Sequence, residues 1–199
     1  MNMKKPVKIF DLGSNTFRIT NELISQYTDI VEVHTFEPQP HLALHELENL
    51  KHHHPDIKFF HNPVAVWFED VKLKFFEPKK WGYNFKGSST ILRHDGPESV
   101  GMEYDEPYNV DAIDFPKYFH NNTSTDTFNV IKMDIEGAEY MVLPELLKEP
   151  TLQNIDVLKC EYHLDMYKNK SKYYAKFKII HDDIFKILTE SRVAHNKWF

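Results

Sequence analysis

Short apolar runs alternate with stretches of helical periodicity along the first sixty residues of the chain. The run "VKIFDL" stops at Gly13, which is typical of a strand buried on both faces. Glu37-Pro38 closes a later run, where proline cannot pair in a ladder. The pattern predicts, in order, a strand at 7–12, a helix at 16–27, a strand at 30–36, a helix at 40–50 and a strand at 57–60.

The rest of the chain repeats this alternation after a turn-rich interruption. Residues 63–76 contain two apolar runs on either side of Glu69-Asp70, which predicts a hairpin. Residues 77–108 are rich in glycine and proline, and we expect a long functional loop. The remaining predicted elements are a strand at 128–133, a helix beginning within "DIEGAEYMVLPELL", a strand at 155–161 and a helix at 173–189.

Strands that alternate with helices are typical of an α/β fold with a mostly parallel central sheet and helices on both faces, which is Rossmann-like. A chain of 199 residues can bury the core of one such domain but hardly two. We therefore expect a single domain over residues 1–199. The chain opens directly on the first strand, so it remains open whether a longer polypeptide contains this domain.

Charge and composition exclude several classes of partner. The net charge is −6, and no basic run is long enough to follow a phosphate backbone, so we expect no nucleic-acid partner. No apolar run approaches the roughly 20 residues that cross a bilayer. Cys160 is the single cysteine, which excludes an internal disulfide and favours a reducing compartment, so we predict a cytoplasmic protein. The sequence indicates no oligomeric state.

Gly13 and Glu37 follow the first two predicted strands, whose carboxyl ends should meet at one edge of the sheet. A glycine there lets the backbone approach a ligand, and an acid at the second strand can accept hydrogen bonds from both hydroxyls of a ribose. The dinucleotide fingerprint Gly-x-Gly-x-x-Gly is absent, because Ser14 to Phe17 follow the glycine. The pattern favours a nucleoside cofactor without phosphates, although Gly13 alone also fits an ordinary turn.

Three motifs, in this order, resemble the FkbM family of S-adenosyl-L-methionine-dependent methyltransferases: "FDLGSN" at 10–15, "TFEPQP" at 35–40 and "IKMDIEGAEYMVL" at 131–143. The resemblance covers about residues 7–163. It implies a class I methyltransferase fold with about seven strands, the last pair antiparallel, and S-adenosyl-L-methionine as cofactor. One departure is Phe17, which stands where the family usually has glycine.

The resemblance and the strand ends together suggest which residues hold the cofactor. Glu37 would bind the ribose, and Asp11 would orient the amino acid end through water or backbone. Asn62 and Ala65 would border the adenine. The predicted cofactor-binding residues are Asp11, Gly13, Asn15, Glu37, Asn62, Ala65 and Asp134.

Three residues near the ends of later strands could act on the acceptor. His163 is our first choice of general base, because imidazole titrates near neutral pH. Asp134 is the second choice, and Glu136 could contact the acceptor. Glu139 is expected to stabilise the start of a helix, and Lys132 to point away from the site without a role.

A divalent ion on Asp134, Glu161 and His163 is chemically possible, but the spacing does not require one, and we predict no metal. The tract "HHH" at 52–54 is expected to be a solvated connection.

The acceptor could be a sugar hydroxyl of a glycan or glycoconjugate, because the 77–108 loop carries aromatic residues that can stack on sugar rings: Trp81, Tyr83, Phe85 and Tyr104. Methylation of a polyketide or another small-molecule hydroxyl is the alternative. A non-catalytic cofactor-binding or glycan-binding module, with Phe17 filling part of the cofactor space, is a third possibility.

Overall fold

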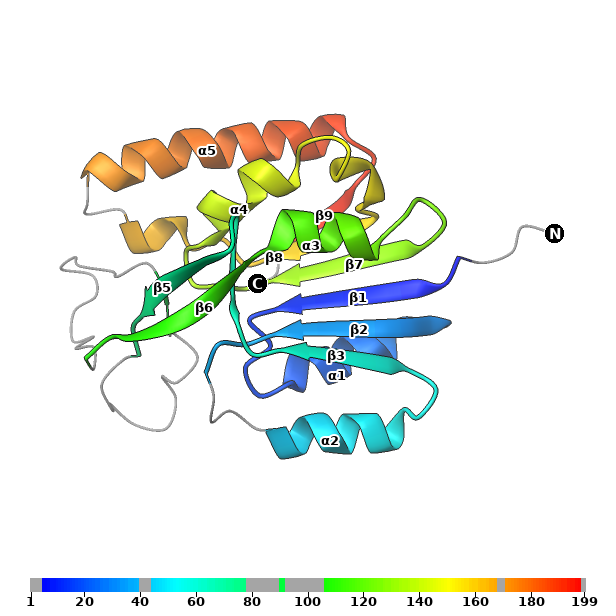
Figure 1. Ribbon diagram of the computed structural model, residues 1–199. Helices are drawn as coiled ribbons and strands as arrows, with labels where there is room; N and C mark the ends of the chain where they lie inside the picture. Colours follow the sequence, from blue (N-terminus) through cyan, green and yellow to red (C-terminus); the bar gives the residue numbers. More distant parts are fainter. Residues whose placement is uncertain (1–4, 40–43, 78–89, 92–105, 168–170, 198–199) are drawn as a thin grey trace.

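A six-stranded parallel sheet forms the centre of the molecule in the computed structural model, which describes residues 5–39, 44–77, 90–91, 106–167 and 171–197. The strand order is β3-β2-β1-β7-β8-β9, and every neighbouring pair runs parallel (Figure 1). The strands are β1 (Val7–Leu12), β2 (Ile30–Phe36), β3 (Lys58–Asn62), β7 (Phe128–Met133), β8 (Val157–Cys160) and β9 (Ala194–Lys197).

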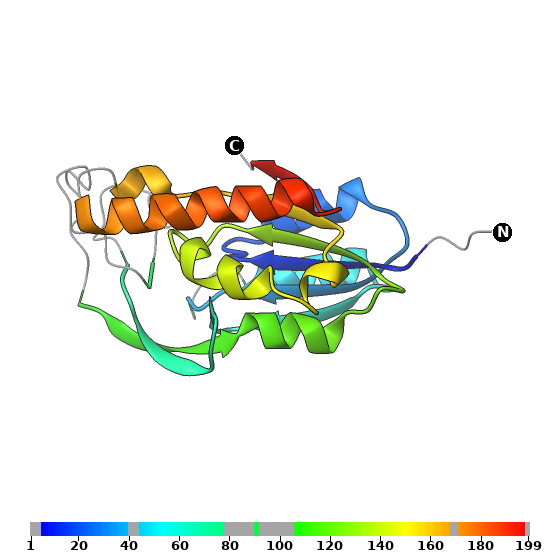
Figure 2. The same ribbon diagram turned by 90° about the horizontal axis from the view of Figure 1, so that it is seen from above.

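Helices cover both faces of this sheet because successive side chains along each central strand point to opposite sides. Ile9 of β1 packs in a cluster with α1 (Arg18–Gln26) and α2 (Leu44–His53). Phe10, its neighbour, packs on the other face with the second group of helices (Figure 2). This group contains α3 (Phe115–Asn122), α4 (Glu139–Leu146) and α5 (Ser171–Glu190). The α/β fold predicted from the sequence is confirmed.

A small three-stranded sheet lies beyond the carboxyl ends of the large sheet (Figure 1). Its strands are β4 (Ala65–Trp67), β5 (Val71–Phe75) and β6 (Tyr108–Asp114), in the order β4-β6-β5. The predicted hairpin at 63–76 is therefore wrong. β6 inserts between the two runs, parallel to β4 and antiparallel to β5, and its residues Val110 and Ala112 complete a buried cluster with Ala65, Trp67 and Phe75.

The last strand of the large sheet also differs from expectation. The family resemblance implied an antiparallel final pair, whereas β9 runs parallel to β8. Helix α5 returns the chain along the sheet, so the strand that follows enters in the same direction as its neighbour. Two short 3₁₀ turns, η1 (Leu152–Asn154) and η2 (Leu164–Tyr167), precede β8 and α5. No helix in the described part of the chain is both long and apolar enough to cross a bilayer.

Candidate active site

Gly13 joins β1 to the turn that lies at the carboxyl end of the sheet. Its φ is +74°, and a Cβ placed on it would lie 2.0 Å from the carbonyl oxygen of Asp134. The amide of Asp134 donates to the carbonyl of Leu12 at 3.1 Å, so the ends of β1 and β7 are tightly joined. Glycine is thus required by a contact inside the protein, in addition to any approach of a ligand.

A buried cation supports this turn from below. The Lys132 ammonium donates to the carbonyl oxygen of Gly13 at 2.7 Å and lies 3.2 Å from Asp11 Oδ1. Asp11 Oδ2 accepts a hydrogen bond from the Thr20 hydroxyl at 2.5 Å. Burial lowers the pKa of Lys132, but the carboxylates of Asp11 and Asp134 raise it more, so the pKa lies above its ordinary value. The expectation that Lys132 has no role is wrong, and Thr20 was missed.

Glu37 follows β2 with only 6% of its surface exposed. Its Oε2 accepts the backbone N–H of Asn15 at 2.9 Å, and its Oε1 accepts that of Gln39 at 3.0 Å. Burial raises the pKa of Glu37, and the two backbone donors partly oppose this shift. A carboxylate oxygen accepts more than one hydrogen bond, so the side chain can still bind two hydroxyl groups.

Glu37 and Asp134 line a pocket that encloses about 580 Å³ of space, part of it open to solvent. Three carboxylates border the pocket, and its described lining contains no lysine, arginine or histidine. The lining residues are Gly13, Asn15, Phe36, Glu37, Pro38, Gln39, Val64, Ala65, Val66, Phe75, Ile91, Asp134, Ile135, Glu136 and Ala138.

The chemistry of this lining favours a ligand with a positive charge, an apolar part and no phosphates. Glu37 and Asp134, when ionised, would repel a phosphate and attract a cation. The apolar side chains, including Val66 and Phe75, offer a surface for a flat ring. A sulfonium nucleoside such as S-adenosyl-L-methionine combines these properties, so the residues present fit the cofactor that the resemblance implied.

The structure separates the predicted cofactor residues into two groups. Gly13, Asn15, Glu37, Ala65 and Asp134 line the pocket, whereas Asp11 and Asn62 do not. Asp11 is fully buried below the Gly13 turn. The Asn62 amide donates to the carbonyls of Thr35 and Phe60, at 3.2 and 3.3 Å, and so joins the ends of β2 and β3. Both residues support the pocket from behind.

Phe17 does not enter the pocket. It has a left-handed backbone, with φ 59°, and is 2% exposed. Its ring packs in the cluster under α1 and contacts the His61 ring edge-to-face, with 5.5 Å between centroids. The left-handed φ explains why glycine suits this position, and the packing removes the reason for expecting Phe17 to fill the cofactor space.

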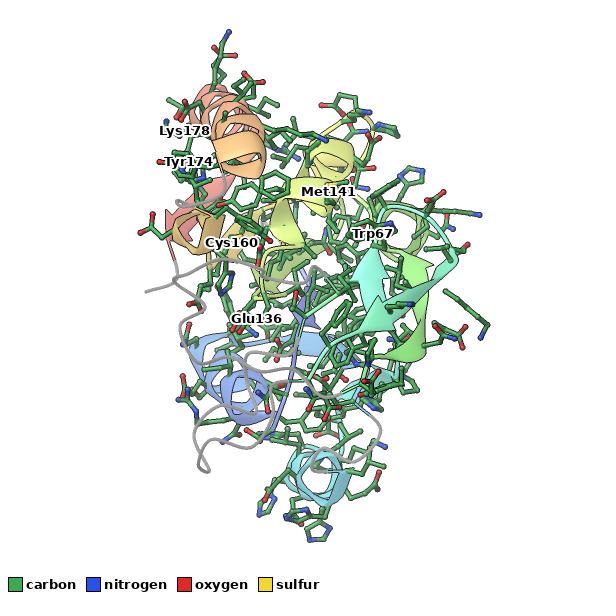
Figure 3. The ribbon with its side chains drawn as sticks, turned by 90° about the vertical axis from the view of Figure 1, so that its left-hand side faces the viewer. Trp67, Glu136, Met141, Cys160, Tyr174 and Lys178 are labelled. Atoms are coloured by element: carbon green, nitrogen blue, oxygen red, sulfur yellow. The ribbon has the colours of Figure 1, made fainter. Side chains whose placement is uncertain are left out.

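His163 lies after β8 within a group of carboxylates. Its Nδ1 is 2.9 Å from Oε1 of Glu139, which is fully buried. Its Nε2 is 3.8 Å from Asp134 Oδ1 and 3.6 Å from both Glu136 Oε2 and Glu161 Oε1. In Figure 3, which faces the carboxyl ends of the strands, Glu136 lies near the middle of this face.

Burial and the mutual charges shift the titration of this cluster. Burial lowers the pKa of His163, but the hydrogen bond and charge of Glu139 raise it more, to about 9. Burial raises the pKa of Glu136 to about 8 and also raises that of Asp134. The pKa of the His163 imidazole therefore lies above the near-neutral value that we expected for a general base. Glu139 has two roles, since its Oε1 also accepts the backbone N–H of Ile135 at 3.0 Å.

Several pocket residues could not be anticipated from the sequence. Phe75 and Ile91 come from the segments interpreted as a hairpin and a loop, and no local motif marked them. The proposed acceptor-binding aromatics Trp81, Tyr83, Phe85 and Tyr104 lie outside the described residues.

The model of the methyltransferase FkbM domain matches residues 11–192, which is nearly the whole chain. No curated protein matches the sequence. No solved structure matches it either.

Proposed function

The chain belongs to the FkbM methyltransferase family, and from this premise we propose that it transfers the methyl group of S-adenosyl-L-methionine to a sugar hydroxyl of a glycan or glycoconjugate. The observation that carries the proposal is the acidic pocket without a described basic residue at the carboxyl ends of β1, β2 and β7. This pocket has the charge that a cationic cofactor without phosphates requires.

In this proposal different residues of the pocket bind the ribose, the adenine and the positive charge of the cofactor. Glu37 accepts hydrogen bonds from the two ribose hydroxyls, with its orientation fixed by the amides of Asn15 and Gln39. Ala65 and Val66 border the adenine. Asp134 also lines the pocket and would attract the positive charge of the cofactor. S-adenosyl-L-methionine, when bound, supplies an activated methyl group with a neutral thioether as leaving group.

The acceptor hydroxyl also needs a group that takes its proton, since an alcohol is a poor nucleophile at neutral pH. Asp134 is the residue we propose, because it lines the pocket and 29% of its side chain is exposed. Glu136 lies beside it and would hydrogen-bond the acceptor. His163 is only 7% exposed and both of its nitrogens face carboxylates, so we assign it to organising these acids rather than to proton abstraction.

The choice of a sugar rests on the aromatic composition of residues 77–108, where stacking side chains are concentrated. A polyketide or other small-molecule hydroxyl is the competing acceptor. We further propose that residues 1–199 act as one domain, and that the protein works in the cytoplasm, where a buried free thiol such as that of Cys160 stays reduced.

The test has two stages. Isothermal titration with S-adenosyl-L-methionine should show saturable binding that S-adenosylhomocysteine competes with. Absence of a heat of binding, or absence of this competition, would reject the proposed enzymatic function. Release of S-adenosylhomocysteine is then measured over a panel of sugars and non-sugar alcohols. Turnover with sugars supports the proposal, whereas turnover confined to non-sugar alcohols would assign the competing acceptor.

A further inference from the structure

The Nε2 atom of His163 faces three carboxylates without a hydrogen bond to any described residue. The oxygens of Asp134, Glu136 and Glu161 lie 3.6–3.8 Å away from it. An N–H···O hydrogen bond spans about 2.7–3.2 Å, so a proton on Nε2 is too distant to bridge these atoms well. The His163 side chain is nevertheless 93% buried, because its exposed fraction is 7%.

The other ring nitrogen is fixed by Glu139. Nδ1 lies 2.9 Å from Glu139 Oε1, and this carboxylate has no exposed surface. Histidines that bind metals commonly donate their second ring N–H to a carboxylate, which orients the ring and makes the free nitrogen a stronger ligand. When Nδ1 donates to Glu139 and Nε2 has given up its proton, the lone pair of Nε2 faces the oxygens of the cluster.

We propose that Asp134, Glu136 and His163 form a binding site for a divalent first-row transition-metal ion, with the carboxylate of Glu161 beside it. One ligand atom from each of the three lies within 4.8 Å of the others. Ligands about 2.1 Å from a shared ion lie about 3.0–3.4 Å apart at tetrahedral or octahedral angles. On binding an ion, the distances of 3.6–3.8 Å at Nε2 would therefore shorten by a few tenths of an ångström, and the two carboxylate oxygens, which lie within 4.8 Å of each other, would move closer together.

The ligand types narrow the choice of ion. Carboxylates alone would suit Mg²⁺ or Ca²⁺, whereas an imidazole ligand favours Mn²⁺, Fe²⁺ or Zn²⁺. The ion pairs of the described residues place one ammonium beside these ligands, that of Lys132, which lies 3.8 Å from Asp134 Oδ2.

The place of the site gives the ion a possible use. Asp134 and Glu136 also line the pocket, so an ion bound between them would be accessible to an oxygen of a bound molecule. A hydroxyl that ligates a metal ion becomes more acidic. This last consequence rests on the proposed function, whereas the existence of the site does not.

Binding is tested on the untagged, EDTA-treated protein with Mn²⁺ alone. Electron paramagnetic resonance of free Mn²⁺ should show one saturable site, and pulsed measurements on the bound ion should detect nitrogen coupling from an imidazole. Asp134→Asn and His163→Ala should each weaken binding at least tenfold. If a variant fails to fold, the nitrogen coupling in the wild type still decides the question.

Matched substitutions separate this site from surface binding. Asp183→Asn and His120→Ala change exposed residues of α5 and α3, and both should bind Mn²⁺ as the wild type does. His53→Ala tests the histidine tract at 52–54, in which His52 and His53 are exposed, as the source of the nitrogen signal. The proposal is overturned if Mn²⁺ does not bind, or if it binds equally to the Asp134 and His163 variants. Either result would leave the proposed binding of S-adenosyl-L-methionine standing, because that binding is measured separately.

Discussion

Replacing Lys132 by methionine tests whether the buried ion pair below the Gly13 turn stabilises the fold. The side chains of Lys132 and Asp11 are 2% and 0% exposed and lie 3.2 Å apart. Methionine retains most of the volume but leaves Asp11 as an uncompensated buried charge. Breaking a buried pair in this way costs about 3–5 kcal/mol, which is a large part of the roughly 5–15 kcal/mol that stabilises a typical domain.

Urea denaturation followed by circular dichroism gives the free energy of unfolding. With a slope of about 2 kcal/mol per molar urea, the Lys132→Met midpoint should fall by roughly 2 M. Lys178→Met is the matched control, because Lys178 pairs with Asp182 on the surface of α5, and such pairs contribute under about 1 kcal/mol.

A double-mutant cycle then identifies the cause of the loss. Asp11→Asn removes the charge that Lys132→Met leaves behind, while its amide oxygen can still accept from Thr20. The double variant should therefore regain stability relative to Lys132→Met. The reasoning is refuted if Lys132→Met lies within 1 kcal/mol of the wild type, or if the two single effects simply add.

Two further predictions test other parts of the account. Gly13→Ala should lower the free energy of unfolding by about 2–5 kcal/mol, because the added Cβ meets a backbone carbonyl and the residue has a positive φ. Asn15→Gly is the control, because Asn15 also has a positive φ, and it should change the free energy of unfolding by under about 1 kcal/mol. Equal losses in the two variants would contradict the steric explanation for Gly13. Burial lowers the pKa of His34 to about 4, although the hydrogen bond and charge of Glu32 raise it. The charge of Lys8 lowers this pKa further, and the Tyr118 hydroxyl lies 2.8 Å from His34 Nδ1. As the pH falls, the imidazole is therefore protonated in the unfolded chain before it is protonated in the folded protein, and the free energy of unfolding should fall by about 2–3 kcal/mol between pH 6.5 and 4. Urea midpoints measured across this range should fall less in His34→Gln than in the wild type. Identical pH profiles of the two proteins would exclude His34 as the cause.

The central sheet was predictable because each strand obeys its local pattern. Residues 7–12, 30–36 and 128–133 were assigned with the bounds that the structure shows. β6 was not predicted, since "YNVDAID" alternates polar and apolar residues beside a turn-rich stretch. Its pairing with β4 and β5 depends on contacts between segments more than 30 residues apart, which no local pattern encodes.

The candidate site was predictable to the extent that strand ends mark it. Glu37 and Asp134 follow β2 and β7 and line the pocket as expected. Lys132 was misjudged because alternation along a strand says which face a side chain leaves from, but not that a long side chain can reach the neighbouring turn. The carboxylates around His163 could not be predicted either, because they come from residues that follow β7 and β8 and from Glu139 of α4.

Calorimetric titration of S-adenosyl-L-methionine into the wild type and Glu37→Gln tests the central claim most directly. We expect the wild type to bind, and the variant to bind about 10–100-fold more weakly, because hydrogen bonds to a charged acceptor contribute about 1.5–3 kcal/mol. Glu22→Gln, on the exposed side of α1 and paired only with Arg18 among the described residues, should bind as the wild type does. Unchanged affinity in Glu37→Gln, or no binding to the wild type, would contradict the account.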